Sequence, residues 1–243
     1  MNVKAVFFDV FGTLMPYSDI PRHIILSKRA QLAGLDIAPE RMKTALETLA
    51  AQSKSFAMAG QLGGEDVPRD RDYWEMTFGN VLKACDVRGD VRPYATAMCD
   101  SFLQTEDFYL DDEALPTLRG LKQRGLAVGV ISNAPKGLAH TLEKYGILPE
   151  LIVAVGSQDI GFEKPDPRIF NYALKETGMQ AQECAYVGDE YMTDARAAKA
   201  VGMLGIFLDR NSNRDGQRQV TDVPSVRRLS ELLSPDSPLW SGQ

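Results

Sequence analysis

One stretch near the N-terminus, residues 5–14, constrains the fold of this chain more than any other part of the sequence. An apolar run of strand-forming residues ends there in Asp9 and is followed by Gly12, which permits a sharp turn. This pattern predicts a buried parallel strand that delivers Asp9 to its carboxyl end, where open α/β sheets bind their ligands. A short strand stopped by a solvated aspartate is the simpler explanation for this stretch alone. Three later stretches with polar residues at strand ends or in loops favour the first interpretation.

From about residue 112 onward, helical and strand-like patterns alternate along the chain. Because right-handed crossovers through single helices make successive strands parallel, we expect an α/β fold with a three-layer core and a central parallel sheet. The first strand should be central, between the strand that ends at Ser132 and the strand that ends before Asp189. Helices are predicted at 112–124, 136–145, 167–177, 193–200 and 226–233, and strands at 126–131, 151–155, 184–187 and 204–208.

The segment between the first strand and this alternating region has a different character. It contains no convincing strand pattern, but helical periods at 21–33, 39–59, 72–85 and 91–103. These periods predict a four-helix cap at 16–103, inserted into an α/β core formed by 1–15 and 104–243.

Composition narrows the classes of function. The 243-residue chain has a net charge of −6 and no basic stripe, which argues against nucleic acid. It has no apolar run near the roughly 20 residues of a membrane span and no basic leader, so we expect a cytoplasmic protein without a membrane partner. The three scattered cysteines, Cys85, Cys99 and Cys184, predict reduced core thiols. With only two histidines, any metal must be hard and bound by oxygen.

Polar residues at the predicted strand and loop ends should converge at one edge of the sheet. Two carboxylates there, Asp9 and Asp189, repel each other unless a cation lies between them, and oxygen ligands suit Mg²⁺. Lys164 could hold both the nucleophile and an anionic substrate, and Ser132 with the following backbone amides could donate to phosphate oxygens. Since no cysteine or histidine is suitably placed, the nucleophile would be a carboxylate. The residues concerned are Asp9, Ser132, Asn133, Lys164, Asp189 and Asp194.

Four short motifs follow one another along the chain: Asp9-Val10-Phe11-Gly12-Thr13, Val130-Ile131-Ser132-Asn133, Lys164-Pro165-Asp166-Pro167 and Gly188-Asp189-Glu190-Tyr191-Met192-Thr193-Asp194. With these motifs in this order, the chain resembles the haloacid dehalogenase superfamily of hydrolases over nearly its whole length. The resemblance implies a Rossmann-like core with an inserted helical cap, closest to uncharacterised hydrolase-like proteins near the 2-haloacid dehalogenases. Each motif alone is weak, whereas four in order at predicted strand ends or loops are specific.

The resemblance also implies a role for each matching residue. Asp9 would be the nucleophile, Thr13 would support the loop, and Lys164 would balance charge. Ser132, Asn133 and Lys164 would bind the transferring phosphate group. The implied cofactor is Mg²⁺, bound by Asp9, by Asp189, by the backbone carbonyl of Phe11, and less directly, through water or another ligand, by Asp194.

Phe11 departs from the phosphatase pattern. Phosphatases of this superfamily usually carry at this position a second aspartate that protonates the leaving alkoxide, and phenylalanine cannot do so. The 2-haloacid dehalogenases have an aromatic residue there, because halide leaves without a proton, but they need no metal and have neutral residues where this chain has Asp189. The metal argument favours the phosphatase.

The sequence therefore predicts a Mg²⁺-dependent hydrolase of a small, anionic phosphate monoester with a good leaving group, enclosed between cap and core. A metal-independent 2-haloacid dehalogenase and a non-catalytic module that binds Mg²⁺ and phosphate are the alternatives. The sequence specifies no oligomeric state.

Overall fold

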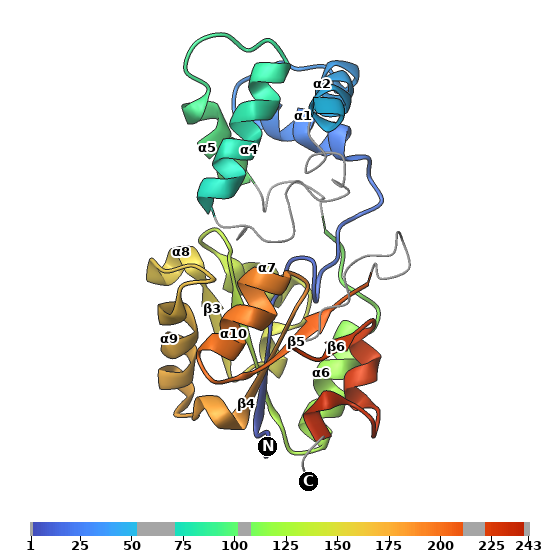
Figure 1. Ribbon diagram of the computed structural model, residues 1–243, viewed down its shortest axis with the longest axis vertical. Helices are drawn as coiled ribbons and strands as arrows, with labels where there is room; N and C mark the ends of the chain where they lie inside the picture. The colour runs from blue at the N-terminus through green and yellow to red at the C-terminus, as the bar shows by residue number, and fades with distance from the viewer. Residues whose placement is uncertain (1, 53–70, 102–107, 211–221, 241–243) are drawn as a thin grey trace. The chain divides into compact units, whose positions relative to one another are not determined.

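The computed structural model describes residues 2–52, 71–101, 108–210 and 222–240 (Figure 1). The chain divides into two compact units, one of Met1–Tyr17 with Phe108–Gln243 and the other of Ser18–Asp107. We call them the core unit and the cap unit. The division falls a few residues beyond the predicted boundaries at 15/16 and 103/104. No helix in the described part of the chain is long and apolar enough to cross a membrane.

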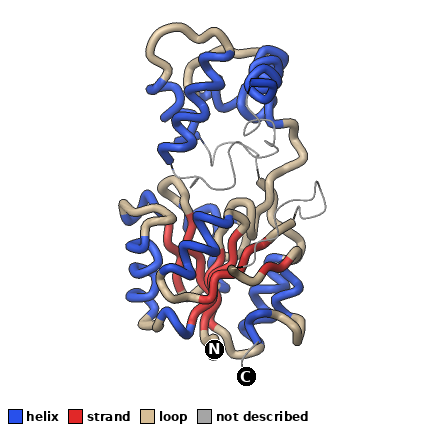
Figure 2. The backbone as a smooth tube through the Cα atoms, in the orientation of Figure 1, coloured by secondary structure: helices blue, strands red, loops and turns tan. Residues whose placement is uncertain are grey.

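The core unit contains a six-stranded parallel sheet with strand order β3-β2-β1-β4-β5-β6, which confirms the predicted fold class. As predicted, β1 is central, with β2 and β4 as its neighbours. Figure 2 shows the strands together at the middle of the unit with helices on both sides. The strands are β1 (Ala5–Phe8), β2 (Ala127–Ser132), β3 (Val153–Gly156), β4 (Cys184–Gly188), β5 (Leu204–Leu208) and β6 (Ser225–Val226).

Continuous apolar runs form the central strands because both faces of this sheet are covered by helices. All four residues of β1 are buried. On one face, Phe7 and Tyr186 pack with Phe170 of α9 and Ala198 of α10 in a single apolar cluster. On the other face, α6 packs against β2 and against the 3₁₀ helix Leu229–Leu233.

The helices of the core unit connect successive strands. They are α6 (Ala114–Gln123), α7 (Leu138–Lys144), α8 (Ser157–Ile160), α9 (Pro167–Thr177) and α10 (Arg196–Ala200). A π-helical turn, Tyr191–Ala195, leads into α10, and further 3₁₀ helices lie at Leu148–Glu150, Ala181–Glu183 and Pro238–Trp240. Helix α9 has the start that its sequence predicts, because the Asp166 side chain accepts the backbone N–H of Arg168 and Pro167 occupies the first turn.

The cap unit has an apolar core of its own. Its described helices are α1 (Arg22–Leu32), α2 (Pro39–Gln52), α4 (Arg71–Ala84) and α5 (Arg92–Asp100). Met42, Phe78 and Met98, from three of these helices, are buried in one cluster. The predicted helices extend to residues 59 and 103, and their last parts, 53–59 and 102–103, lie outside the described residues.

Two segments of the core unit that lead to and from the cap unit pair with each other. The N–H of Tyr109 donates to the carbonyl of Pro16 at 3.2 Å, and the N–H of Asp111 donates to the carbonyl of Leu14 at 3.0 Å. An antiparallel bridge joins Tyr17 to Phe108. We call residues 14–17 and 108–111 the linker ribbon.

The predicted helix at 226–233 is wrong in its first part. Ser225 and Val226 form β6, paired with Phe207 and Leu208 of β5, and only Leu229–Leu233 is helical, as a 3₁₀ helix. A two-residue strand is too short to show a periodic pattern, so its existence depends on the neighbouring edge of the sheet.

The contact between β5 and the π-helical turn generates a stability prediction. A side-chain carbon added at Gly205 would overlap the backbone carbonyl of Ala195, which cannot move without shifting the turn. We expect Gly205→Ala to lower the free energy of unfolding by about 1–3 kcal/mol, as overpacking does. In Gly120→Ala the added carbon would lie 2.8 Å from a methyl group of Leu233, the flexible end of a side chain, so the loss should be smaller. Urea unfolding measures both, and equal midpoints would contradict this explanation.

Candidate active site

The carboxyl ends of three adjacent strands bring the predicted site residues together. Phe8 of β1 is in register with Val130 of β2 and Val187 of β4, so the residues that follow in each strand meet at one edge. Asp9 comes directly after β1, Ser132 is the last residue of β2, and Asp189 comes directly after β4. Parallel pairing is therefore what assembles residues that are more than 120 positions apart in the sequence.

A buried lysine links the two sides of this edge. Lys164 is 2% exposed, and its Nζ donates to Asp9 Oδ1 at 2.8 Å, to Asp194 Oδ1 at 2.5 Å and to the hydroxyl of Tyr186 at 2.9 Å. These three acceptors match the three hydrogens of the ammonium group. Burial by itself would lower the pKa of Lys164, but attraction to Asp194 and Asp9 outweighs it, so the pKa lies above its usual value. The charged form of Lys164 is therefore favoured by its two carboxylate partners.

The carboxylate of Asp9 is oriented by two bonds to the same oxygen. Its Oδ1 accepts the hydroxyl of Ser132 at 2.8 Å as well as the ammonium group of Lys164. In the described part of the chain, no hydrogen bond reaches Oδ2. An oxygen without a hydrogen bond on a carboxylate held in place is suited to attack an electrophile.

Thr13 and Gly12 position the carboxylate of Asp189. The hydroxyl of Thr13 donates to Asp189 Oδ1 at 2.9 Å and accepts the N–H of Asp189 at 3.0 Å. Gly12 has a φ of 92°, and a side-chain carbon there would overlap the Asp189 carboxylate. These two bonds tie the loop that carries Thr13 to Asp189.

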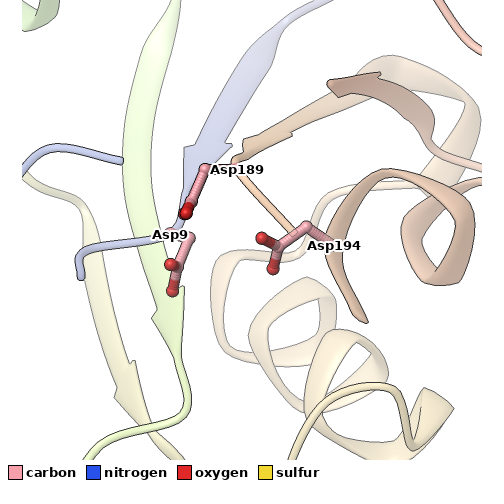
Figure 3. Close-up of side chains that lie close together, drawn as sticks. All are labelled: Asp9, Asp189 and Asp194. Atoms are coloured by element: carbon pink, nitrogen blue, oxygen red, sulfur yellow. The ribbon is translucent and has the colours of Figure 1, made fainter. Parts of the chain in front are cut away.

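The carboxylates at this edge carry more negative charge than the lysine can balance. Ligand oxygens of Asp9, Asp189 and Asp194 all lie within 4.8 Å of one another (Figure 3). Burial, followed by repulsion from Glu190, Asp9 and Asp194, raises the pKa of Asp189 well above its usual value. Burial also raises the pKa of Asp194 to about 6, although attraction to Lys164 opposes this. A cluster of oxygen donors that repel one another fits a hard divalent cation.

Asn133 makes other contacts than those predicted. Its Nδ2 donates to the carbonyl of Lys164 at 2.8 Å, and its Oδ1 accepts the N–H of Lys164 at 2.7 Å. Both polar ends of the side chain thus bind the backbone of Lys164 and fix the loop that carries it. A role of Asn133 in binding the transferring group stays a prediction.

The ring of Phe11 packs against an aromatic residue of the linker ribbon. Its ring is 8% exposed and lies 4.8 Å, between centroids, from the ring of Phe108, which also contacts Tyr17. The apolar side chain is therefore packed as part of the core unit. Metal binding by its backbone carbonyl stays a prediction.

Tyr186 belongs to the site but lies outside the four motifs and was not predicted as a site residue. Its hydroxyl accepts a hydrogen bond from Nζ of Lys164 and donates one to the carbonyl of Ile131 at 2.6 Å, so it helps to fix the position of the lysine side chain. The available signal was a tyrosine within an otherwise apolar strand, because a buried tyrosine hydroxyl needs a hydrogen-bond partner. Arg210, which contacts the backbone of Thr13, and its partner Asp111 were also not predicted, since neither lies in one of the motifs.

Comparison with known proteins decides the family. The sequence model of haloacid dehalogenase-like hydrolases matches residues 3–202. The chain belongs to the haloacid dehalogenase-like hydrolases. This confirms the predicted family and the prediction that the protein is a hydrolase.

Individual relatives match over nearly full length. The chain is 30% identical over 236 residues to haloacid dehalogenase-like hydrolase domain-containing protein 3 of Danio rerio, covering 95% of this chain and 93% of the relative. It is 30% identical over 243 residues to the glyceraldehyde 3-phosphate phosphatase of Methanopyrus kandleri, covering 95% of this chain and 96% of the relative. A haloacid dehalogenase-type hydrolase of Bacillus subtilis has a similar fold, with a TM-score of 0.68 at 17% identity, covering 96% of this chain and 97% of that one.

The crowded carboxylates generate a prediction for the metal-free protein. Because the pKa of Asp189 is raised, ionisation of its carboxyl group costs more free energy in the folded than in the unfolded chain. The stability of the protein therefore falls as the pH rises from the pKa of Asp189 in the unfolded chain through its pKa in the folded chain. Asp189→Asn removes this cost. With chelator present, we expect the variant to melt above the wild type, by a margin that grows from about pH 5 to about pH 8.

Thermal unfolding with EDTA measures this margin, and Asp236→Asn is the control. Asp236 is an exposed aspartate of the same unit, away from the cluster, and its replacement should leave the melting temperature nearly unchanged. A margin for Asp189→Asn that does not change with pH would contradict the electrostatic explanation.

Proposed function

We propose that the protein is a Mg²⁺-dependent phosphatase that hydrolyses a small phosphate monoester, with Asp9 as the nucleophile. The main observation behind this proposal is a cluster of three carboxylates, two of which pair with one buried ammonium group. Both the ammonium group and the Ser132 hydroxyl bind the same oxygen of Asp9. The similarity to a relative named as a glyceraldehyde 3-phosphate phosphatase supports a sugar-phosphate-sized substrate.

The excess negative charge of the site supports the binding of a metal ion. A phosphate monoester is an anion and would be repelled by three carboxylates balanced by one lysine. Asp9 and Asp189 would hold Mg²⁺, with the Phe11 carbonyl as a further ligand and Asp194 acting less directly, since Asp194 already pairs with Lys164. When bound, Mg²⁺ neutralises phosphate oxygens and stabilises the charge that develops as the phosphoryl group is transferred.

The residues of the chain account for the bond changes. Oδ2 of Asp9 attacks phosphorus, the bond from phosphorus to the ester oxygen breaks, and an aspartyl phosphate forms while the leaving group departs as an alkoxide or phenolate that takes its proton from water. Lys164 and Ser132 hold Oδ1 and keep Oδ2 directed at the substrate. Water then attacks phosphorus and loses a proton to the solvent, the bond from phosphorus to Oδ2 breaks, and Asp9 is regenerated as a carboxylate while inorganic phosphate is released.

Phe11 limits which substrates react. Its packed ring cannot protonate the departing alkoxide, and the loss of a general acid costs ~10²–10⁴-fold in rate. The enzyme should therefore act on esters with good leaving groups. The same observation favours a second candidate, a 2-haloacid dehalogenase in which Asp9 attacks carbon, since halide leaves without a proton. Such an enzyme would not require the metal for which Asp189 is suited.

Hydrolysis of p-nitrophenyl phosphate tests the proposal. Because p-nitrophenolate leaves without protonation, we expect turnover with Mg²⁺ and its loss with EDTA. Asp9→Asn should abolish turnover, because an amide oxygen is a far weaker nucleophile than a carboxylate.

The opposite outcomes identify the alternatives. Halide release from 2-haloacids that is indifferent to EDTA would replace the phosphatase with the dehalogenase. Thermal stabilisation by Mg²⁺ and phosphate without any turnover would indicate a binding module.

Replacing Phe11 tests its proposed effect on substrate range. Phe11→Asp should raise the rate on alkyl phosphates relative to p-nitrophenyl phosphate, by up to ~10²-fold, because it restores a proton donor. Phe11→Leu is the matched control, since it also removes the contact with Phe108 but supplies no carboxyl group. Measured rate ratios that are the same in both variants would contradict this account of Phe11.

A further inference from the structure

Arg210 reaches the loop that carries the site from a strand two places away in the sheet. It lies two residues after the end of β5, whereas the loop, residues 9–13, follows β1. Its Nη2 donates to the carbonyl of Thr13 at 2.9 Å, and its Nη1 makes a longer bond to the carbonyl of Gly12 at 3.4 Å. We call residues 9–13 the catalytic loop.

The two carbonyls belong to the residues that position Asp189. Thr13 binds the Asp189 carboxylate through its hydroxyl, and Gly12 provides the space in which that carboxylate lies. The turn itself is closed by the N–H of Gly12 on the carbonyl of Met15 and by the N–H of Met15 on the carbonyl of Val10, each at 2.7 Å. Neither of these bonds uses the carbonyls of Gly12 and Thr13, which receive the guanidinium group instead.

The guanidinium group also binds the linker ribbon. Nη2 of Arg210 forms an ion pair with Asp111 Oδ2 at 2.5 Å. The other oxygen of Asp111 accepts the N–H of Glu113 at 2.8 Å, next to the first residue of α6, and the N–H of Asp111 pairs with Leu14. The ion pair is mostly buried, with side chains 24% and 18% exposed. One guanidinium group thus joins the catalytic loop, the ribbon and the region just before α6.

We propose that Arg210 is a positioning residue that holds the catalytic loop, and through it Asp189, in the arrangement used for turnover. A planar guanidinium with several fixed donors can bind two carbonyls and a carboxylate at once, which the single ammonium group of lysine cannot do with the same geometry. The part of the inference that concerns turnover depends on the phosphatase function proposed above. The anchoring of the loop does not.

Another ion pair of the core unit supplies a matched control. Arg228, also after β5 in the chain, pairs with Glu113. Its side chain is 70% exposed, and within the described part of the chain its hydrogen bonds go to Glu113 and not to the catalytic loop. Arg210→Met and Arg228→Met therefore remove the same charge from the same unit, and only the first removes a contact with the loop.

Hydrogen–deuterium exchange of peptides covering residues 9–17 tests the anchoring without any assay of activity. We expect Arg210→Met to accelerate exchange there, because the bonds of the turn open more often without the guanidinium group. Arg228→Met should leave it unchanged. Equal exchange in the two variants would overturn the proposal.

Kinetics on p-nitrophenyl phosphate tests the consequence for turnover. Arg210→Met should lower kcat by ~10–100-fold with a smaller change in KM, since misplacing a catalytic group by about 1 Å can cost ~10²-fold. Arg210→Lys should recover part of kcat, and Asp111→Asn should lower kcat less than Arg210→Met. A variant that melts earlier but keeps the wild-type kcat would overturn the positioning role.

The two tests separate the two proposals. A wild-type protein that hydrolyses no phosphate ester under any metal condition would contradict the phosphatase function. The exchange comparison would still support or overturn the anchoring of the loop by Arg210.

Discussion

The site depends on one buried cation. Lys164 is removed from water, which costs several kcal/mol unless every hydrogen of the ammonium group has a partner and its charge is opposed. Asp9, Asp194 and Tyr186 meet both conditions, and they come from the residue directly after β1, from the turn after β4 and from β4 itself. The strand order therefore has an electrostatic reason as well as a packing reason, because these acceptors converge only when β1 and β4 are adjacent.

The same site carries an excess of negative charge that the fold maintains by specific contacts. Thr13 holds Asp189 beside Asp9 despite their repulsion, and a side-chain carbon at Gly188 would overlap Asp194. Such an arrangement raises the pKa of Asp189 through burial and repulsion, so the metal-free protein is under electrostatic strain at its own site. A cation that relieves the strain would bind at the place of the proposed reaction, which links stability and the proposed activity in one group of residues.

Much of the fold followed from local patterns. Continuous apolar runs predicted β1, β2, β4 and β5, because strands that are buried on both faces need apolar residues throughout. The pair Asp166-Pro167 predicted the start of α9, because both residue types are favoured at the beginning of a helix. The pattern failed at residues 226–233, where a two-residue strand exists only through pairing with β5. Local patterns also gave no sign that the side chain of Asn133 holds the backbone of Lys164. An amide side chain carries no local sign of which partner it will find.

By itself, the sequence determined the fold class and the strand ends at which polar residues stand, since these follow from short-range patterns of apolar and polar residues, and its four motifs identified the family by resemblance. Only the tertiary structure decided which partner each of these residues has. Tyr186 beneath Lys164, and Arg210 between Thr13 and Asp111, depend on chain segments between 22 and 197 residues apart. Contacts over such separations are set by strand order and register, which no local stretch of the sequence encodes.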